Sequence, residues 1–215
     1  SLRFKHGARD LHFGFVVSLL NDLFGIQVRG GCSCAGPYGH SLLDMDMDYS
    51  RAIEEEIQKG LMVLRPGWVR LNFNYFIDER EFEYLLQALA LVAQLGSKLL
   101  PWYHFDADAG VWRYQREGMT LPASLAAFSF GSVQARQADS APEVDFDEIL
   151  REAREELQRE DRHGDTAALE LPASAETLRW FVLPQEVELR QAQQDDRACA
   201  ASGRQLTPEQ ALSAS

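Results

Sequence analysis

The chain has 215 residues, 46% of them hydrophobic and 25% charged, which is enough for one or two globular domains with a buried core. Its net charge of −12 leaves no basic stripe to neutralise phosphates, and this argues against nucleic acid as a partner. No apolar run approaches the ~18 residues of a membrane span, and the first residues lack the pattern of a secretory signal.

The charge is unevenly divided along the chain. Residues 1–135 carry a net charge of −3 and residues 136–215 carry −9. The first part is nearly neutral and rich in apolar residues, whereas the second is acidic and poor in them. We therefore expect a packed domain over residues 1–130 and an acidic, partly disordered extension over residues 131–215. Because the chain starts without Met inside a patterned segment, we also expect it to be the back part of a longer protein.

The front of the chain predicts a helix, a short strand and a glycine-rich loop. Apolar residues recur at helical spacing from Leu11 to Phe24, Gly25 suits the end of that helix, and Ile26–Val28 suits a strand. The loop over residues 28–40 holds four glycines and a proline, which should keep it out of helix and sheet.

The same loop carries the side chains most capable of chemistry. Cys34 is a candidate nucleophile, and Arg29 and His40 are the nearby groups that could lower the pKa of its thiol. A tight turn with cysteines as small buried hydrophobes is an equally good interpretation. A metal site of Cys32, Cys34 and His40 offers only three ligands, at a spacing unlike common zinc sites, so we predict no metal. Three cysteines in this arrangement suit a reducing, cytoplasmic compartment.

The middle of the chain predicts two helices and a strong strand. The alternating aspartates of residues 44–48 lack the glycine and glutamate of a calcium loop and suit a helix entry, with Ser50 capping a helix that ends at Gly60. Residues 68–76 alternate strictly, as in a strand with one buried face. Asp78 should cap a long helix to about Gln94, with an apolar stripe formed by Phe82, Leu85, Leu86, Leu89 and Val92.

The back of the chain predicts fewer elements. Residues 106–110 suit the turn of a hairpin, residues 134–142 a linker, and residues 145–161 an amphipathic helix. The apolar segment 178–184 could dock as an edge strand, and disorder is expected from Arg190 onward.

Arg70 is the most informative charge in the predicted strand. It shares one face of the strand with Asn72 and Asn74. A guanidinium presents a planar fork that matches a carboxylate, so this face suits recognition of an amino or keto acid. A simply solvated face would show the same pattern.

These motifs resemble a known family. Arg29, Gly31, Cys34, Ala35 and Pro37 match the R-x-G-x-x-C-A-x-P pattern of the second type of cysteine desulfurase and selenocysteine lyase, which are class V aminotransferase-like enzymes dependent on pyridoxal phosphate (PLP). The segment 69–74, followed by a helix, is similar to the family's strand that carries the substrate-binding arginine. The resemblance covers roughly residues 8–115.

The resemblance implies the C-terminal domain of a fold-type I enzyme: an α/β (α+β) small domain with a short, mainly antiparallel sheet packed by helices. It places Cys34 at the catalytic cysteine and Arg70 at the substrate carboxylate. We predict Asn72, Arg29 and His40 as further substrate-binding residues. The family's cofactor lysine follows a histidine in a preceding large domain, whereas this chain has only Lys5, Lys59 and Lys98 in other settings. We thus expect PLP on the missing large domain, a homodimer in the whole enzyme, and no activity from this chain alone. The alternative is a non-enzymatic binding module derived from that domain.

Overall fold

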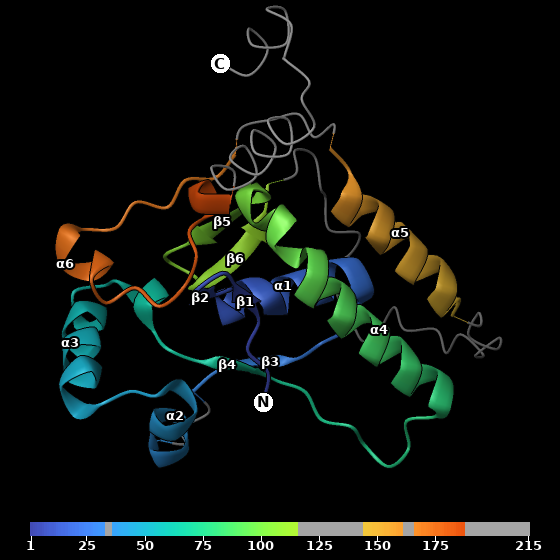
Figure 1. The fold of residues 1–215 in the computed structure, drawn as a ribbon, viewed down its shortest axis with the longest axis horizontal. Coiled ribbons are helices and arrows are strands. Elements are labelled where there is room, and N and C mark those ends of the chain that lie inside the picture. The colour runs from blue at the N-terminus through green and yellow to red at the C-terminus, as the bar shows by residue number, and fades with distance from the viewer. Residues whose placement is uncertain (33–35, 116–143, 161–165, 188–215) are drawn as a thin grey trace, which may run out of the picture.

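A computed structural model describes residues 1–32, 36–115, 144–160 and 166–187. It confirms a mixed α/β fold, in which helices and 3₁₀ helices surround three short antiparallel strand pairs, β1–β2, β3–β4 and β5–β6 (Figure 1). In chain order the elements are β1 (Lys5–His6), β2 (Arg9–Asp10), α1 (Phe13–Phe24), β3 (Arg29–Gly31), α2 (Gly36–Leu43), α3 (Met47–Gln58), η1 (Met62–Leu64), β4 (Trp68–Arg70), α4 (Glu79–Leu95), η2 (Gly96–Trp102), β5 (Tyr103–Asp106), β6 (Val111–Tyr114), α5 (Phe146–Gln158) and α6 (Ala173–Glu176).

Helix α1 lies at the centre of the molecule and confirms the first predicted helix. Its N-cap is His12, whose ring Nδ1 accepts a hydrogen bond from the Gly14 amide. It ends at Gly25, which takes the left-handed conformation (φ 65°) that a side chain disfavours and glycine accepts. The apolar spacing read from the sequence places its buried residues, among them Phe15 and Leu19, on the faces that meet the other elements.

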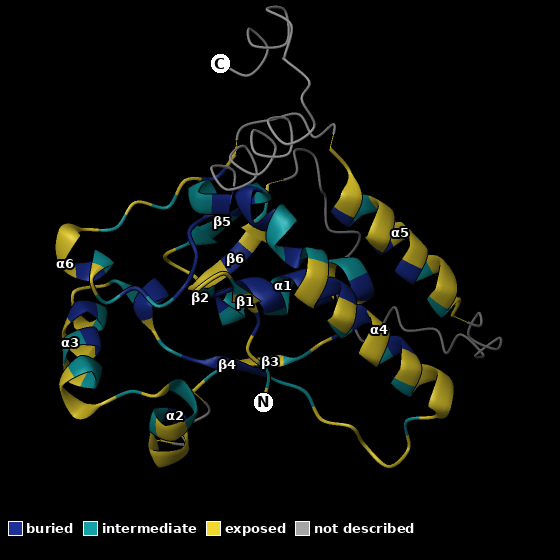
Figure 2. Ribbon diagram, in the orientation of Figure 1, coloured by how far each residue is buried: buried dark blue, intermediate teal, exposed yellow. Residues whose placement is uncertain are grey.

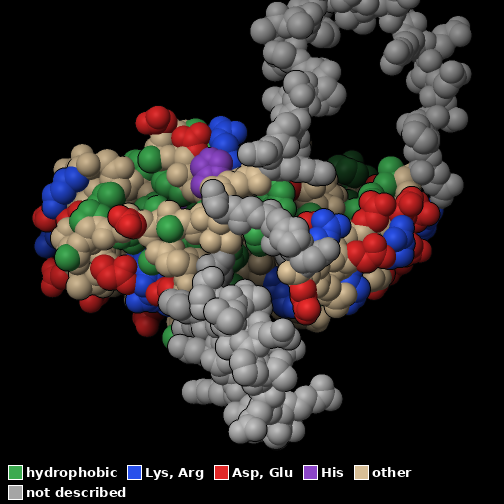
Figure 3. Space-filling view, turned by 90° about the horizontal axis from the view of Figure 1, so that it is seen from above, with side chains coloured by type: hydrophobic (Ala, Val, Ile, Leu, Met, Phe, Trp, Pro, Cys, Tyr) green, Lys and Arg blue, Asp and Glu red, His purple; other side chains and the backbone are tan. Residues whose placement is uncertain are grey.

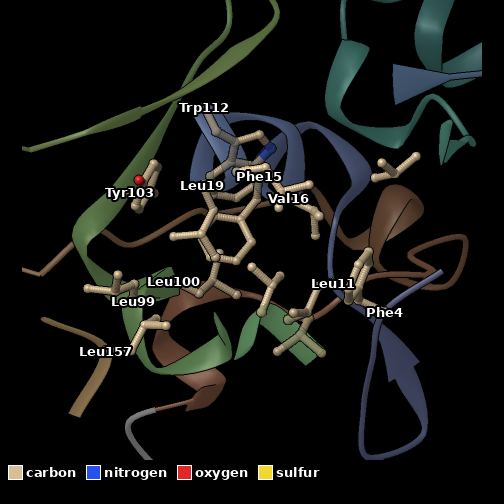
Figure 4. Packing of buried hydrophobic residues seen from close by; sticks show 14 of the residues in the cluster. Phe4, Leu11, Phe15, Val16, Leu19, Leu99, Leu100, Tyr103, Trp112 and Leu157 are labelled. Atoms are coloured by element: carbon tan, nitrogen blue, oxygen red, sulfur yellow. The ribbon is translucent and has the colours of Figure 1, made fainter. Parts of the chain in front are cut away.

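One hydrophobic core is built around this helix (Figure 4). Phe15 packs edge-on against Tyr103, and Leu157 of α5 joins the same cluster with no exposed surface. The cluster also takes in Phe181 and Val187, so residues from the region predicted as an acidic tail share the core of the first part (Figure 2). The predicted boundary near residue 130, the linker at 134–142 and the disorder after Arg190 lie outside the described residues.

The chain between residues 166 and 187, here named the C-terminal strap, crosses the N-terminal hairpin. Phe181 forms a parallel bridge with Asp10, and the Val182 amide donates to the Asp10 carbonyl. The Trp180 indole donates to the Leu64 carbonyl, so the strap also contacts η1. The predicted edge strand at 178–184 is therefore a single bridge within an extended, well-packed segment.

Arg179 fixes the charged side of the strap. Its side chain is 2% exposed and forms ion pairs with Glu176 and Glu186, while one of its Nη atoms donates to the Phe181 carbonyl. Arg9 adds a second cation beside Glu186, at 3.2 Å. A buried guanidinium that forms ion pairs and hydrogen bonds with several groups can hold a segment in one arrangement.

The β3–β4 ribbon differs from the strands expected here. The strand predicted at 26–28 is found three residues further along the chain, as β3. The strand predicted at 68–76 is limited to Trp68–Arg70. Val69 also exchanges backbone hydrogen bonds with Leu2, which occupies the other edge of β4. Residues 71–76 have no such partner strand, and alternation alone does not reveal where a partner ends.

The glycine-rich loop was expected to avoid regular structure, and this expectation is wrong. Gly30 and Gly31 belong to β3, and Gly36 and Pro37 start α2. A Cβ on Gly30 would lie 2.7 Å from the Phe13 ring, so the glycine serves close packing on α1. Proline fits the first turn of a helix, where its missing N–H has no intrahelical partner.

Two helix details also differ from expectation. Asp46, not Ser50, caps α3, by accepting from the Tyr49 amide. Helix α4 has the expected cap at Asp78, completed by Glu81 as a capping box, but its buried side is rotated from the predicted stripe. Leu86 is 40% exposed, because the residues that face the core are Tyr84, Ala88, Leu91 and Val92.

One stretch, Glu79–Trp102, is long and apolar enough to cross a membrane by length and composition. In the fold it forms α4 and η2, which contact α1 and α5. Its residues Tyr84, Ala88, Leu91 and Val92 belong to the hydrophobic core.

The turn before β4 makes a close backbone approach that yields a prediction. A Cβ on Gly67 would lie 2.6 Å from the Gly31 Cα, whereas a Cβ on Gly36 would meet no atom of the described residues within 4 Å. We expect Gly67→Ala to lower the free energy of unfolding by about 1–3 kcal/mol, because the backbones of the ribbon must separate. The matched Gly36→Ala should change it by about 1 kcal/mol or less. Urea unfolding of both variants tests this, and equal effects would contradict the close approach.

Candidate functional site

The outer face of the β3–β4 ribbon carries two arginines side by side. The antiparallel register pairs Arg29 with Arg70, Gly30 with Val69, and Gly31 with Trp68. Gly30 and Val69 face α1, where the space beside Gly30 is filled by Phe13 and Val17. Since successive residues of a strand point to opposite faces, Arg29 and Arg70 lie on the face away from α1. Directly opposed residues have Cβ atoms about 4.5–5.5 Å apart.

Neither guanidinium of this arginine pair has an acidic partner among the described residues. None of the ion pairs found there includes Arg29 or Arg70. The Nε of Arg70 is also buried without a hydrogen-bond partner in this part of the chain. Like charges directly opposed on a strand pair repel each other, and a buried donor without an acceptor is costly. The arrangement is thus suited to an anion.

Helix α2 covers the other end of the same face. The Tyr38 ring meets the Trp68 ring edge-on, with 5.4 Å between centroids, and Gly39 lies against the Trp68 ring. Trp68 is only 2% exposed as a result. The start of α2 and the arginine pair therefore lie on one side of the ribbon. Figure 1 shows the ribbon and α2 below α1.

The predicted site residues are brought together only in part. Arg29 and Arg70 are adjacent, and Asn72 follows Arg70 as an exposed residue just beyond β4. Cys32 is an exposed thiol at the end of β3. Cys34 lies outside the described residues, so its role as a nucleophile stays a prediction.

His40 is engaged by the junction of α2 and α3. Its Nδ1 lies 3.2 Å from the Met45 carbonyl oxygen and its Nε2 lies 3.4 Å from the Ser50 hydroxyl. These contacts fix the ring between the two helices. A role in substrate binding stays a prediction for this residue too.

Two of the chain's three lysines are engaged by carboxylates. Lys5 is paired with the Asp10 carboxylate at 2.7 Å. Lys59 donates to Glu56, and this contact raises the pKa of Lys59, whereas a lysine that forms an imine must lose its proton readily. Lys98 lies on η2, between α4 and β5. No metal-binding group of three or more His, Cys, Asp or Glu side chains occurs among the described residues.

Charges elsewhere are distributed differently from those of the arginine pair. On the face seen in Figure 3, acidic and basic side chains alternate. On α5, Arg151 pairs with Glu148 and Glu155, as expected for residues three and four apart on a helix. The arginine pair is unusual in having two neighbouring cations and no such compensation within the described ranges.

Two residues that build the site were not singled out from the sequence as site residues. Tyr38 and Trp68 hold α2 against the ribbon, and the register joining Arg29 to Arg70 was not expected. The signal for Trp68 was present, because alternation put it on the face of Arg70. Nothing in the local sequence predicted the register, which brings Gly67 and Gly31 into close approach.

Comparisons of this chain with models of protein families, with curated proteins and with solved structures found no match.

Proposed function

We propose that this chain is the C-terminal portion of a PLP-dependent, class V aminotransferase-like enzyme related to cysteine desulfurases and selenocysteine lyases, acting on an amino acid. The observation that carries the proposal is the arginine pair, which stands without acidic partners on the outer face of the ribbon. A bidentate guanidinium–carboxylate contact both binds and orients an amino acid.

Each site residue has one task in this proposal. Arg70 holds the substrate carboxylate, Arg29 and Asn72 line the same face, and Cys34 is the catalytic residue that the motif assigns. His40 keeps α2 and α3 together at the edge of this face. The chain contributes substrate binding, since none of its lysines follows a histidine as the family's cofactor lysine does.

The remaining parts of the enzyme lie outside this chain. The lysine and the rest of the PLP site belong to a preceding large domain, the whole enzyme is a homodimer, and it works in the cytoplasm. Residues 131–215 form an acidic extension whose helix α5 and strap pack on the small domain.

The test is to locate the cofactor lysine. The full-length gene product is incubated with PLP, reduced with borohydride, digested, and analysed by mass spectrometry for the modified peptide. We expect one modified lysine, outside residues 1–215 and after a histidine. Modification of Lys5, Lys59 or Lys98, or of no lysine, would overturn the enzyme assignment.

A non-enzymatic binding module is the second candidate, and exposed aromatic rings favour it. Phe73, Tyr75 and Phe76, which follow β4, are 49%, 100% and 70% exposed. Exposed apolar clusters often mark a surface that contacts another protein. The same experiment separates the two candidates, because a module would carry PLP on no lysine.

A further inference from the structure

We infer that the arginine pair selects an amino acid with a second carboxylate. This inference rests on the proposed function and adds the substrate class, namely an acidic amino acid of the aspartate or glutamate type. Arg70 takes the α-carboxylate, and Arg29 takes the carboxylate of the side chain.

The first argument is charge. Arg29 and Arg70 bring two positive charges onto neighbouring positions of one ribbon face. A ligand with a single carboxylate compensates only one of them and leaves the other facing its neighbour. Two carboxylates remove the repulsion that opposed like charges create on a strand pair.

The second argument is how the other arginines are used. Arg3, Arg113 and Arg179 each contact at least one carboxylate within the fold. The chain has 33 acidic and 21 basic side chains, so carboxylates are abundant. Arg65 and Arg154, which are exposed, also have no carboxylate partner in the described part of the chain. What distinguishes Arg29 and Arg70 is that they are directly opposed on one ribbon, so that each lacks a carboxylate beside a second cation.

The third argument is geometry. The opposed Cβ atoms of the ribbon start about 4.5–5.5 Å apart, and each side chain ends in its own planar fork. Each fork can hold one carboxylate through two parallel hydrogen bonds. The donor capacity of the pair thus matches two planar carboxylates on one small molecule.

The test compares ligands that differ in charge. The 215-residue chain is titrated at constant ionic strength with L-aspartate, L-glutamate, L-alanine and inorganic phosphate, and binding is followed by NMR shifts and calorimetry. We expect the better of the two acidic amino acids to bind at least about tenfold more tightly than alanine, since one charge-assisted contact is worth about that factor.

Variants distinguish the contributions of the two arginines to ligand binding. Arg29→Gln should remove the preference for acidic amino acids and leave alanine binding unchanged, and Arg70→Gln should weaken all the amino acids. Arg29→Lys should keep part of the preference, because it keeps the charge without the fork. Arg154→Gln is the matched control, since it removes an exposed arginine on α5, and it should change nothing. Circular dichroism confirms that each variant is folded.

Three outcomes would overturn the inference. These are equal affinity for acidic and neutral amino acids, an unchanged preference in Arg29→Gln, and tighter binding of phosphate than of either acidic amino acid. If the binding test fails but the cofactor lysine is found outside residues 1–215, the proposed function still stands. If no cofactor lysine is found, the enzyme assignment is refuted, and the binding result is unaffected.

Discussion

Acidification from pH 6.5 to pH 3 is expected to lower the free energy of unfolding by about 4 kcal/mol through His12 alone. His12 is buried, and burial lowers its pKa from 6.5 to about 3, against a smaller opposite effect of its hydrogen bond to Val63. Its Nδ1 accepts from the Gly14 amide and from the Trp112 indole, both at 3.0 Å. With two donors at Nδ1, the proton lies on Nε2, which donates to the Val63 carbonyl.

The direction of the effect follows from which state takes up the proton. Below pH 6.5 the unfolded chain protonates this histidine, whereas the folded chain keeps it neutral until about pH 3. The folded state is therefore fully favoured above pH 6.5 and loses about 1.4 kcal/mol for each pH unit below it.

The measurement is urea unfolding at several pH values, for the natural chain and for His12→Asn. Asparagine keeps an acceptor for the Gly14 amide but does not titrate, so its stability should fall less steeply between pH 6.5 and pH 3. The difference between the two slopes isolates His12 from the carboxylates, which titrate in both proteins. Parallel curves would show that His12 is protonated in the folded state.

Phe181→Ala is expected to lower the free energy of unfolding by about 3–5 kcal/mol, the usual loss for a large aromatic removed from a core. Phe181 has no exposed surface and packs edge-on against the His12 ring at 5.0 Å between centroids. It also lies beside Trp180, in the segment that bridges Asp10. Such a loss is a large part of the stability of a domain of this size.

Phe76→Ala provides the matched control, because it makes the same chemical change at a residue that is 70% exposed. It should change the free energy of unfolding by about 0.5 kcal/mol or less. Chemical denaturation of both variants gives the comparison. A small effect of Phe181→Ala would mean that the strap is an appendage and that residues 1–115 hold the core without it.

Helices could be predicted from the sequence because their signals are local. The N-cap at Asp78, the left-handed Gly25 and the spacing of α5 each lie within a few residues of the element that they define. The rotation of α4 was harder to predict. Its sequence offers apolar residues on two sides, and packing against α1 and α5 chooses the side that contains Ala88.

The strands were predicted less well because a strand needs a partner. The alternating pattern of side chains covers residues 68–76, yet only three of these residues, Trp68–Arg70, pair with β3. The length of β3 is limited in turn by the chain's entry into α2 at Gly36. The residues of a strand alone do not predict where its pairing with a partner strand ends.

The candidate site could be predicted as residue types but not as an arrangement. Arg70 was recognisable as a charge within an apolar alternation, and Arg29 as part of a glycine-rich motif. Their pairing depends on the register, which brings Gly31 and Gly67 into close approach and which neither strand's own sequence predicts. His40 is held by Met45 and Ser50, a contact that only the packing of α2 on α3 creates, and its predicted role in substrate binding stays a prediction.

The bridge between Asp10 and Phe181 joins parts of the chain that the ribosome makes far apart in time. The N-terminal hairpin leaves the ribosome early. Leu11 and the His12 ring lack some of their final packing partners until the C-terminal strap has been translated. Contacts between residues so distant in sequence also form slowly, even after both segments have been synthesised. Folding of this domain during synthesis should therefore finish late, and the nascent chain should need protection from aggregation for most of its translation.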